Sequence, residues 1–194
     1  MAGRRAAAGL VLPAVALTAA GCLGSGTKTV TVTHTRTVTS TKTVTTTGSV
    51  SGTKPCTGAQ LAGTFTLVPN SAGAGQIAYA LTLKNSSGSS CLVRGVPQAT
   101  LLGASGTPLP THIRAAGGGK RPIVLPPGAS ALAQARFSPD VAGDGDSQTG
   151  PCQPAAHQLQ VTTAGGGVTE ASIKPPTSVC QQGTLNFEPF GYAG

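Results

Sequence analysis

Residues 61–84 read LAGTFTLVPNSAGAGQIAYALTLK, and this stretch decides the fold class. Apolar and polar side chains alternate in two runs, 61–68 and 76–84, which flank a turn rich in Gly, Pro, Asn and Ser at 69–75. Alternation with period two is typical of strands that bury one face, and the turn residues favour a hairpin. The sequence therefore predicts two antiparallel strands here.

The cysteines around this hairpin fit the same geometry. Cys56 and Cys91 lie at nearly equal distances before and after the turn, so a hairpin brings them opposite each other. A second hairpin centred on residues 164–167 does the same for Cys152 and Cys180. Four cysteines allow three pairings, and this counting favours Cys56–Cys91 and Cys152–Cys180 over the other two. Disulfides also suit an exported chain, whereas no CxxC pair is present to suggest zinc.

Short runs with period two continue to the end of the chain. Turn-forming residues separate them, and no window of about a dozen residues shows an amphipathic helix. Many short strands in a segment of this size predict an all-β fold, an antiparallel sandwich with two disulfides. Further strands are expected at residues 92–94, 98–102, 121–125, 129–137, 158–163, 168–173 and 184–188.

The first residues, MAGRRAAAGLVLPAVALTAAGC, carry a targeting signal. Arg4 and Arg5 precede an apolar run, residues 6–20, which ends in small residues before Cys22. The run is too short for a membrane span and has the flanks of a secretory signal.

The end of this signal resembles the lipobox of bacterial lipoproteins. Ala19, Ala20, Gly21 and Cys22 match its small residues and its cysteine, although leucine is commoner than alanine at the first position. We expect residues 1–21 to be a lipoprotein signal peptide, and Cys22 to carry acyl chains, palmitate among them, that hold the protein on a membrane. The alternative is ordinary cleavage near Ala20 and a freely secreted protein.

A threonine-rich tract separates Cys22 from the strands. Residues 27–47, TKTVTVTHTRTVTSTKTVTTT, place Thr at every odd position and mix Val with charged residues at the even ones. Neither face can bury against a core, because one is all Thr and the other carries charges. We expect residues 22–54 to form a disordered, extended Thr-rich linker, residues 55–190 the sandwich domain and residues 191–194 a tail.

The net charge of +8 belongs mainly to the N-terminal segments. From Cys56 onward seven Lys and Arg face five Asp and Glu, which leaves +2. No basic face stands out, so nucleic-acid binding is not expected. The expected partners are the membrane, through the lipid anchor, and an envelope protein or polymer. The expected location is the extracytoplasmic side of the cell membrane in a Gram-positive type of envelope.

The segment from Cys56 onward resembles a known family. The order LTLKNSSGSSCLVRGVPQATLLGASGTPL, VLPPGASALAQARF, HQLQV and VCQQGTLNFEP is similar to domain of unknown function 4232, which is common in actinobacterial lipoproteins. Val96 stands where that family usually has an aromatic residue. The resemblance implies an immunoglobulin-like sandwich and no established activity. The residues that carry the pattern are Asn85, Cys91, Gly95, Pro97, Pro127, Gly128, Cys152 and Cys180.

Two loops hold the few candidate ligand groups. Asp140, Asp144 and Asp146 lie close together, and clustered carboxylates can hold calcium, but their spacing does not fit an EF-hand. A solvated acidic loop is the better interpretation. The sequence GGGKR at 117–121 lacks the first Gly and the final Ser or Thr of a P-loop and is interpreted as a loop before a strand. If the domain binds a small ligand or a metal, residues 140–146 or 117–120 are the expected mouth.

The sequence contains no recognisable set of catalytic residues. A hydrolase needs a base beside an activated Ser or Cys, with a carboxylate to orient the base. His34, His112 and His157 are far apart in the sequence, no GxSxG motif is present, and the cysteines are assigned to disulfides. We therefore expect no enzyme activity, no resident metal and no cofactor, with an envelope hydrolase as a remote alternative.

Aromatic residues gather at the C-terminus. Phe187, Phe190 and Tyr192 lie within FEPFGYAG, the last eight residues of the chain. We expect them to pack against the sandwich, with an exposed partner patch as the alternative.

Overall fold

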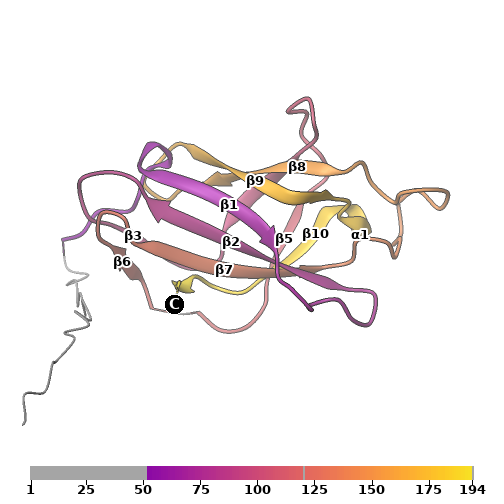
Figure 1. Ribbon diagram of the computed structural model, residues 1–194, viewed down its shortest axis with the longest axis horizontal. Helices are drawn as coiled ribbons and strands as arrows, with labels where there is room; N and C mark the ends of the chain where they lie inside the picture. Colours follow the sequence, from indigo (N-terminus) through magenta and orange to yellow (C-terminus); the bar gives the residue numbers. More distant parts are fainter. Residues whose placement is uncertain (1–51, 120, 194) are drawn as a thin grey trace, which may run out of the picture. The chain divides into compact units, whose positions relative to one another are not determined.

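The computed structural model describes residues 52–119 and 121–193, and within them almost all regular structure is strand. Figure 1 shows how the strands are arranged. The expected signal peptide and most of the Thr-rich linker lie outside the described residues. The elements are η1 (Gly58–Gln60), β1 (Leu61–Leu67), β2 (Ile77–Asn85), β3 (Cys91–Val93), β4 (Gln98–Leu102), β5 (His112–Ala115), β6 (Ile123–Leu125), β7 (Ser130–Phe137), β8 (Ala156–Thr162), β9 (Val168–Thr177), α1 (Cys180–Gly183), β10 (Thr184–Phe187) and β11 (Gly191–Tyr192).

The strands form one large sheet and one small one. The large sheet runs in the order β4-β8-β9-β1-β2-β7-β10-β5, with β11 also paired to β7, and the small sheet joins β3 to β6. Side chains of β4, at one end of the large sheet, and of β10, next to its other end, are buried in the same core. The large sheet therefore curls around a single core, and the expected all-β sandwich with two disulfides is confirmed. It departs from a purely antiparallel sheet at two parallel pairs, β1 with β9 and β10 with β5.

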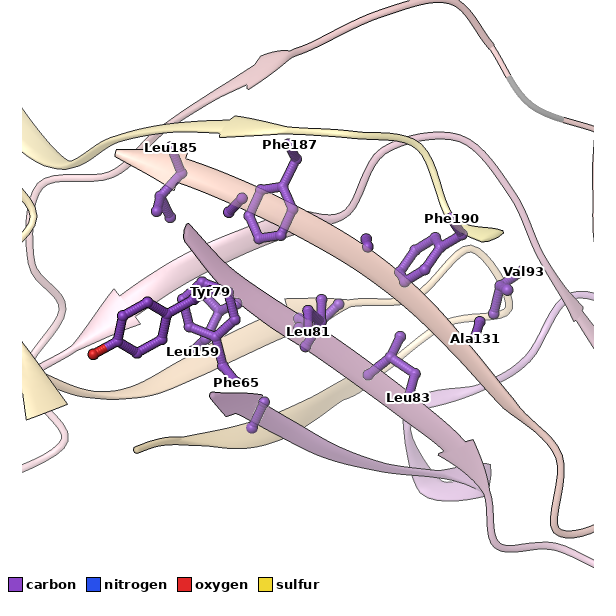
Figure 2. Packing of buried hydrophobic residues seen from close by; sticks show 14 of the residues in the cluster. Phe65, Tyr79, Leu81, Leu83, Val93, Ala131, Leu159, Leu185, Phe187 and Phe190 are labelled. Atoms are coloured by element: carbon purple, nitrogen blue, oxygen red, sulfur yellow. The ribbon is translucent and has the colours of Figure 1, made fainter. Parts of the chain in front are cut away.

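The core is built around four aromatic rings. Phe65 lies 5.1 Å from Tyr79 and 5.9 Å from Phe187 between ring centroids, and Tyr79 lies 5.3 Å from Phe137. Such tilted pairs add to the free energy gained from burying apolar area. Burial raises the pKa of Tyr79, whose hydroxyl donates to the carbonyl of Pro175 at 2.9 Å. Figure 2 shows the labelled core side chains, including Phe65, Tyr79 and Phe187.

Both predicted disulfides are present, and each joins the open end of a hairpin. In the first, β1 pairs with β2 from Leu61 opposite Asn85 to Leu67 opposite Tyr79, and Cys56 and Cys91 lie just beyond the open end. The second hairpin, β8 with β9, contains a bulge between Ala156 and Gln158 that shifts the register toward the cysteines. Counting residues from the turns therefore identified the correct pairing.

Asn85 closes the end of the first hairpin from inside the protein. Its side-chain amide donates to the carbonyls of Ser89 and Leu125, both at 2.8 Å, and its oxygen accepts from the backbone and hydroxyl of Ser87 at 3.0 and 2.7 Å. The residue is fully buried. One side chain thus joins the end of β2, the loop that follows it and the end of β6, with its hydrogen-bonding groups satisfied.

The structure adds two strands that the sequence pattern did not predict. Strand β5 pairs in parallel with β10, and β11 pairs with β7 through Gly191 opposite Leu132 and Tyr192 opposite Ala131. Gly191 and Tyr192 therefore pair with the large sheet, and the amide of Ala193 donates to the carbonyl of Ser130 at 3.2 Å, so the residues expected to form a tail lie along β7. The pairing is possible because the chain turns after β10 and returns along the free part of β7.

Candidate functional site

An apolar pocket lies at the end of the domain that holds β3, beside the Cys56–Cys91 disulfide. It has a volume of about 220 Å³. Figure 2 shows three of its wall residues, Leu83, Val93 and Phe190, gathered at one end of the core cluster. The main apolar wall consists of Leu61, Leu83, Val93, Val96, Val161 and Phe190.

Three segments that are distant in the sequence build this pocket. The loop after β3 contributes Val96, and Gly95 has a φ of 71° that lets the chain turn back there. The C-terminal segment joins this loop through the amide of Phe190, which donates to the carbonyl of Gly95 at 2.9 Å. The third segment is the turn between β8 and β9, where the amide of Gly165 donates to the carbonyl of Cys56 at 3.1 Å. A Cβ on Gly165 would overlap that carbonyl, so the turn can approach this closely only with glycine.

The chain enters the domain beside the same pocket. The amide of Leu92 in β3 donates to the carbonyl of Lys54 at 3.0 Å, and the amide of Cys56 donates to the carbonyl of Leu92 at 2.9 Å. Residues 54–56 thus run alongside β3, and Figure 1 shows that the described chain begins at the end of the domain that holds β3. The pocket, which β3 and Cys56 line, lies at this end too.

The mouth of the pocket is polar and carries positive charge. Arg94, Gln98 and Thr162 line it and are exposed. The guanidinium of Arg94 has no hydrogen bond or ion pair within the described residues, and no Asp or Glu is among the residues that line the pocket. The arrangement is an apolar pocket with a cation at its opening, a form that suits ligand binding.

The predicted acidic loop does not form a cluster of free carboxylates. Asp140 and Asp144 are exposed, whereas Asp146 is buried and accepts four N–H donors. These come from the backbone of Gly143 at 2.8 Å, the side chain of Gln153 at 2.7 Å, and the backbone amides of Gln181 and Gln182. A carboxylate surrounded by donors is held as an anion with few lone pairs left for a cation. Calcium was only a weak candidate for this loop, and Asp146 differs from the expected solvated loop in being buried.

The same hydrogen bonds explain the acidity of Asp146. The backbone amide of Gly143 and then the side chain of Gln153 contribute most, with smaller contributions from Gln182 and Gln181, and together they lower its pKa from 3.8 to about 2. Gln181 and Gln182 both have φ of 55°, a left-handed conformation that is costly for residues with side chains. The charge of Asp146 is thus placed where it stabilises a strained turn.

Asp146 also lies within 4.8 Å of the sulfur atoms of Cys152 and Cys180. Both sulfurs are bonded to each other in the second disulfide, so they offer no thiolate to a metal. The proximity therefore reflects the packing of the acidic loop on this disulfide.

A second, open and polar pocket of about 430 Å³ lies beside this loop. His112 and Arg114 of β5 line it with Asp144 and Thr184. The hydroxyl of Thr184 donates to the carbonyl of Gln181 at 2.7 Å, so its proton is already engaged. His157 lies in β8, which is not a neighbour of β5 in the sheet. The two described histidines are therefore on separate strands, and His34 lies outside the described residues.

The remaining sequence candidates fall outside the apolar pocket, apart from one. Residues 117–119 and 121 form the loop between β5 and β6, as expected, and Lys120 is outside the described part of the chain. Phe187 and Phe190 are buried, and Phe190 lines the pocket. Tyr192 is 62% exposed. Phe187 and Phe190 therefore pack against the sandwich as expected, whereas Tyr192 does not. Cys22 lies outside the described residues, so its lipidation stays a prediction.

Residues 140–146 or 117–120 are the expected mouth only if the domain binds a small ligand or a metal, and the apolar pocket lies at neither stretch. A weak signal was Arg94, a single cation inside the apolar run CLVRGV. Nothing in the pattern showed that this run, the C-terminus and the turn at 163–167 meet. Within the residues that the structure describes, no helix is long and apolar enough to cross a membrane.

Comparison with known proteins gives one match. The family model for a domain of unknown function, DUF4232, matches residues 56–191. No curated protein and no solved structure matches the chain. The matched range begins at the first disulfide cysteine and ends in β11, so it contains both disulfides, the core and all three segments of the apolar pocket. The chain therefore belongs to the DUF4232 family.

Proposed function

We propose that this protein is a non-catalytic, lipid-anchored envelope protein whose β-sandwich domain binds a small apolar ligand at the pocket beside Cys56–Cys91. The observation that carries the binding proposal is the cavity of about 220 Å³ with apolar walls. Small-molecule sites are typically concave pockets with apolar walls and a few polar groups that fix the orientation of the ligand. The pocket beside the first disulfide has this form.

The anchor and the spacer complete the proposal. The sequence before Cys22 has the form of a lipoprotein signal, and two or more acyl chains on that cysteine would hold the protein stably on a membrane. Extended, the residues between Cys22 and Cys56 would reach on the order of 100 Å. The domain would then work outside the cytoplasmic membrane, where a free apolar molecule or an apolar group of an envelope component could reach the pocket.

The anchor is tested by labelling cells with a clickable palmitate analogue. We expect the wild-type chain to carry the label and to fractionate with membranes, and Cys22→Ser to lose both properties. A double Cys152→Ser, Cys180→Ser variant should keep the label, because those sulfurs are in a disulfide. Recovery of unlabelled wild-type protein in the culture medium would mean that the chain is freely secreted.

Binding is tested by titrating the full chain, carrying Cys22→Ser, with 1-octanol. We expect the unfolding midpoint to rise with octanol concentration, because a ligand that binds only the folded state stabilises it, by about 2.7 kcal/mol at 100 times its dissociation constant. Val96→Phe should fill the pocket and abolish the rise. Val168→Phe, at a valine that is 47% exposed and outside the pocket, should leave it intact. Equal responses from both variants would place any binding elsewhere.

A further inference from the structure

The volume of the apolar pocket limits the size of its occupant. Cavities of about 150 Å³ lined by Leu, Ile and Phe stay dry and bind benzene. The pocket here is larger, at about 220 Å³. If a methylene group needs about the 30 Å³ of a water molecule, the pocket holds roughly seven carbon atoms. A membrane acyl chain, which must span half of a hydrocarbon core about 30 Å thick, is too long to be enclosed. A short chain or a single ring fits.

The charge at the opening selects one end group. Arg94 lies at the mouth with its guanidinium unpaired among the described residues. A neighbouring groove on the same disulfide contains Lys54 and, like the pocket, has no Asp or Glu among its lining residues. A guanidinium binds a carboxylate through two parallel hydrogen bonds, which a neutral hydroxyl cannot match. The mouth is therefore complementary to an anion.

We propose that the pocket binds a free, small amphiphile with an apolar body of about seven carbon atoms and one anionic end group, and that Arg94 binds the anion. The apolar body lies against the wall formed by Leu61, Leu83 and Phe190, and the anion stays at the exposed rim beside Gln98 and Thr162. This assignment rests on the proposed binding function and adds the charge of the ligand to it.

The test compares octanoate, 1-octanol and inorganic phosphate by isothermal titration calorimetry with the full chain carrying Cys22→Ser. Octanoate has both parts of the proposed ligand, octanol has the apolar part alone, and phosphate has the charge alone. We expect octanoate to bind about tenfold more tightly than octanol, the range expected for a charge-assisted hydrogen bond, and phosphate not to bind. Raising the salt concentration should weaken octanoate binding and leave octanol binding unchanged.

Two arginine variants locate the effect. Arg94→Gln should reduce octanoate affinity about tenfold, to that of octanol, without changing octanol binding. Arg136→Gln is the matched control, because Arg136 is also exposed but lies in β7 and outside the pocket. It should bind octanoate like the parent chain. Equal loss in both variants would overturn the role assigned to Arg94.

The outcomes separate this assignment from the function on which it rests. Octanoate and octanol binding with equal affinity would leave the apolar binding function in place and overturn the anionic end group. Binding of neither would overturn both. Sedimentation with phosphatidylglycerol vesicles that depends on Arg94 and resists octanoate would show that the anion belongs to a membrane lipid, which would overturn the free amphiphile.

Discussion

Asn85→Ala, which truncates a fully buried polar side chain, should destabilise the domain more than the truncation of a polar side chain at its surface. The wild-type amide donates to the carbonyls of Ser89 and Leu125 and its oxygen accepts twice from Ser87. Each lost hydrogen bond costs about 1 kcal/mol net, and a buried carbonyl left without a donor costs about 1–3 kcal/mol. Leu125 is fully buried, so the loss of the donor to its carbonyl has the largest free-energy cost. The three bonds to Ser87 and Ser89 are only part-buried, so water can replace them in the variant, and we expect a total loss of about 3 kcal/mol, mostly from the buried bond to Leu125.

The assay is urea-induced unfolding of the full chain carrying Cys22→Ser, followed by circular dichroism without reductant. In a parallel thermal scan, a loss of this size should lower the midpoint by about 6–12 °C in a domain of this length. Asn186→Ala is the matched control, because its amide makes one exposed hydrogen bond of 3.3 Å to the carbonyl of Arg136. The control should cost no more than about 0.5 kcal/mol. If both variants lost the same stability, the reasoning about buried hydrogen bonds at Asn85 would be refuted.

Three further predictions concern the left-handed turn and the core. The folded-state pKa of Asp146 is lowered to about 2, so its contribution to stability is present above its ordinary pKa and is lost as the pH falls from about 5 toward 2. Asp146→Asn should therefore flatten the dependence of the free energy of unfolding on pH in this range, as measured by urea unfolding. Gly183→Ala places a Cβ against the carbonyl of Pro110 and should lower the free energy of unfolding by at least about 3 kcal/mol. Gly106 is the control, because its φ is almost the same but a Cβ there meets open space, and Gly106→Ala should cost about 1 kcal/mol in the same assay. Tyr79→Phe removes one buried hydrogen bond and should lower the free energy of unfolding by about 1 kcal/mol. Tyr192→Phe, at an exposed tyrosine, is the control, and a similar loss in that variant would contradict the prediction.

The first hairpin was predictable because its information is local. The alternation in residues 61–84 places Phe65 and Tyr79 inward, and the distance of Cys56 and Cys91 from the turn sets the disulfide. Strand pairing, register and bridge therefore follow from one short stretch. The second hairpin follows in the same way, although its bulge shifts the pairing near Ala156.

Strand β5 was not predictable from its own residues. His112–Ala115 is short and mostly exposed, and it is a strand because β10, about seventy residues later in the chain, pairs with it in parallel. A parallel partner of this kind leaves no turn and no alternation in the local sequence.

The acidic loop and the apolar pocket could not be predicted from the local sequence either. Asp140, Asp144 and Asp146 lie close enough in the sequence to consider a cation site. Asp146 instead accepts hydrogen bonds from Gln181 and Gln182, which lie in α1 about 35 residues later in the chain. The apolar pocket forms where Val96, Phe190 and the turn after β8 meet, and those contacts exist only once the sheet has curled. The sequence shows which functional groups are present, whereas the tertiary contacts determine which of them are already hydrogen-bonded or buried.

The position of the first disulfide also governs how the domain bears tension. A pull along the chain from residue 55 reaches the domain at Cys56 and passes through the sulfur bridge directly to Cys91 in β3. The bridge lies ahead of β1, so the load cannot peel that strand from β2 one hydrogen bond after another. A force on the linker is therefore carried first by the few residues around Cys56 and by the bridge to β3, before it reaches the rest of the sandwich.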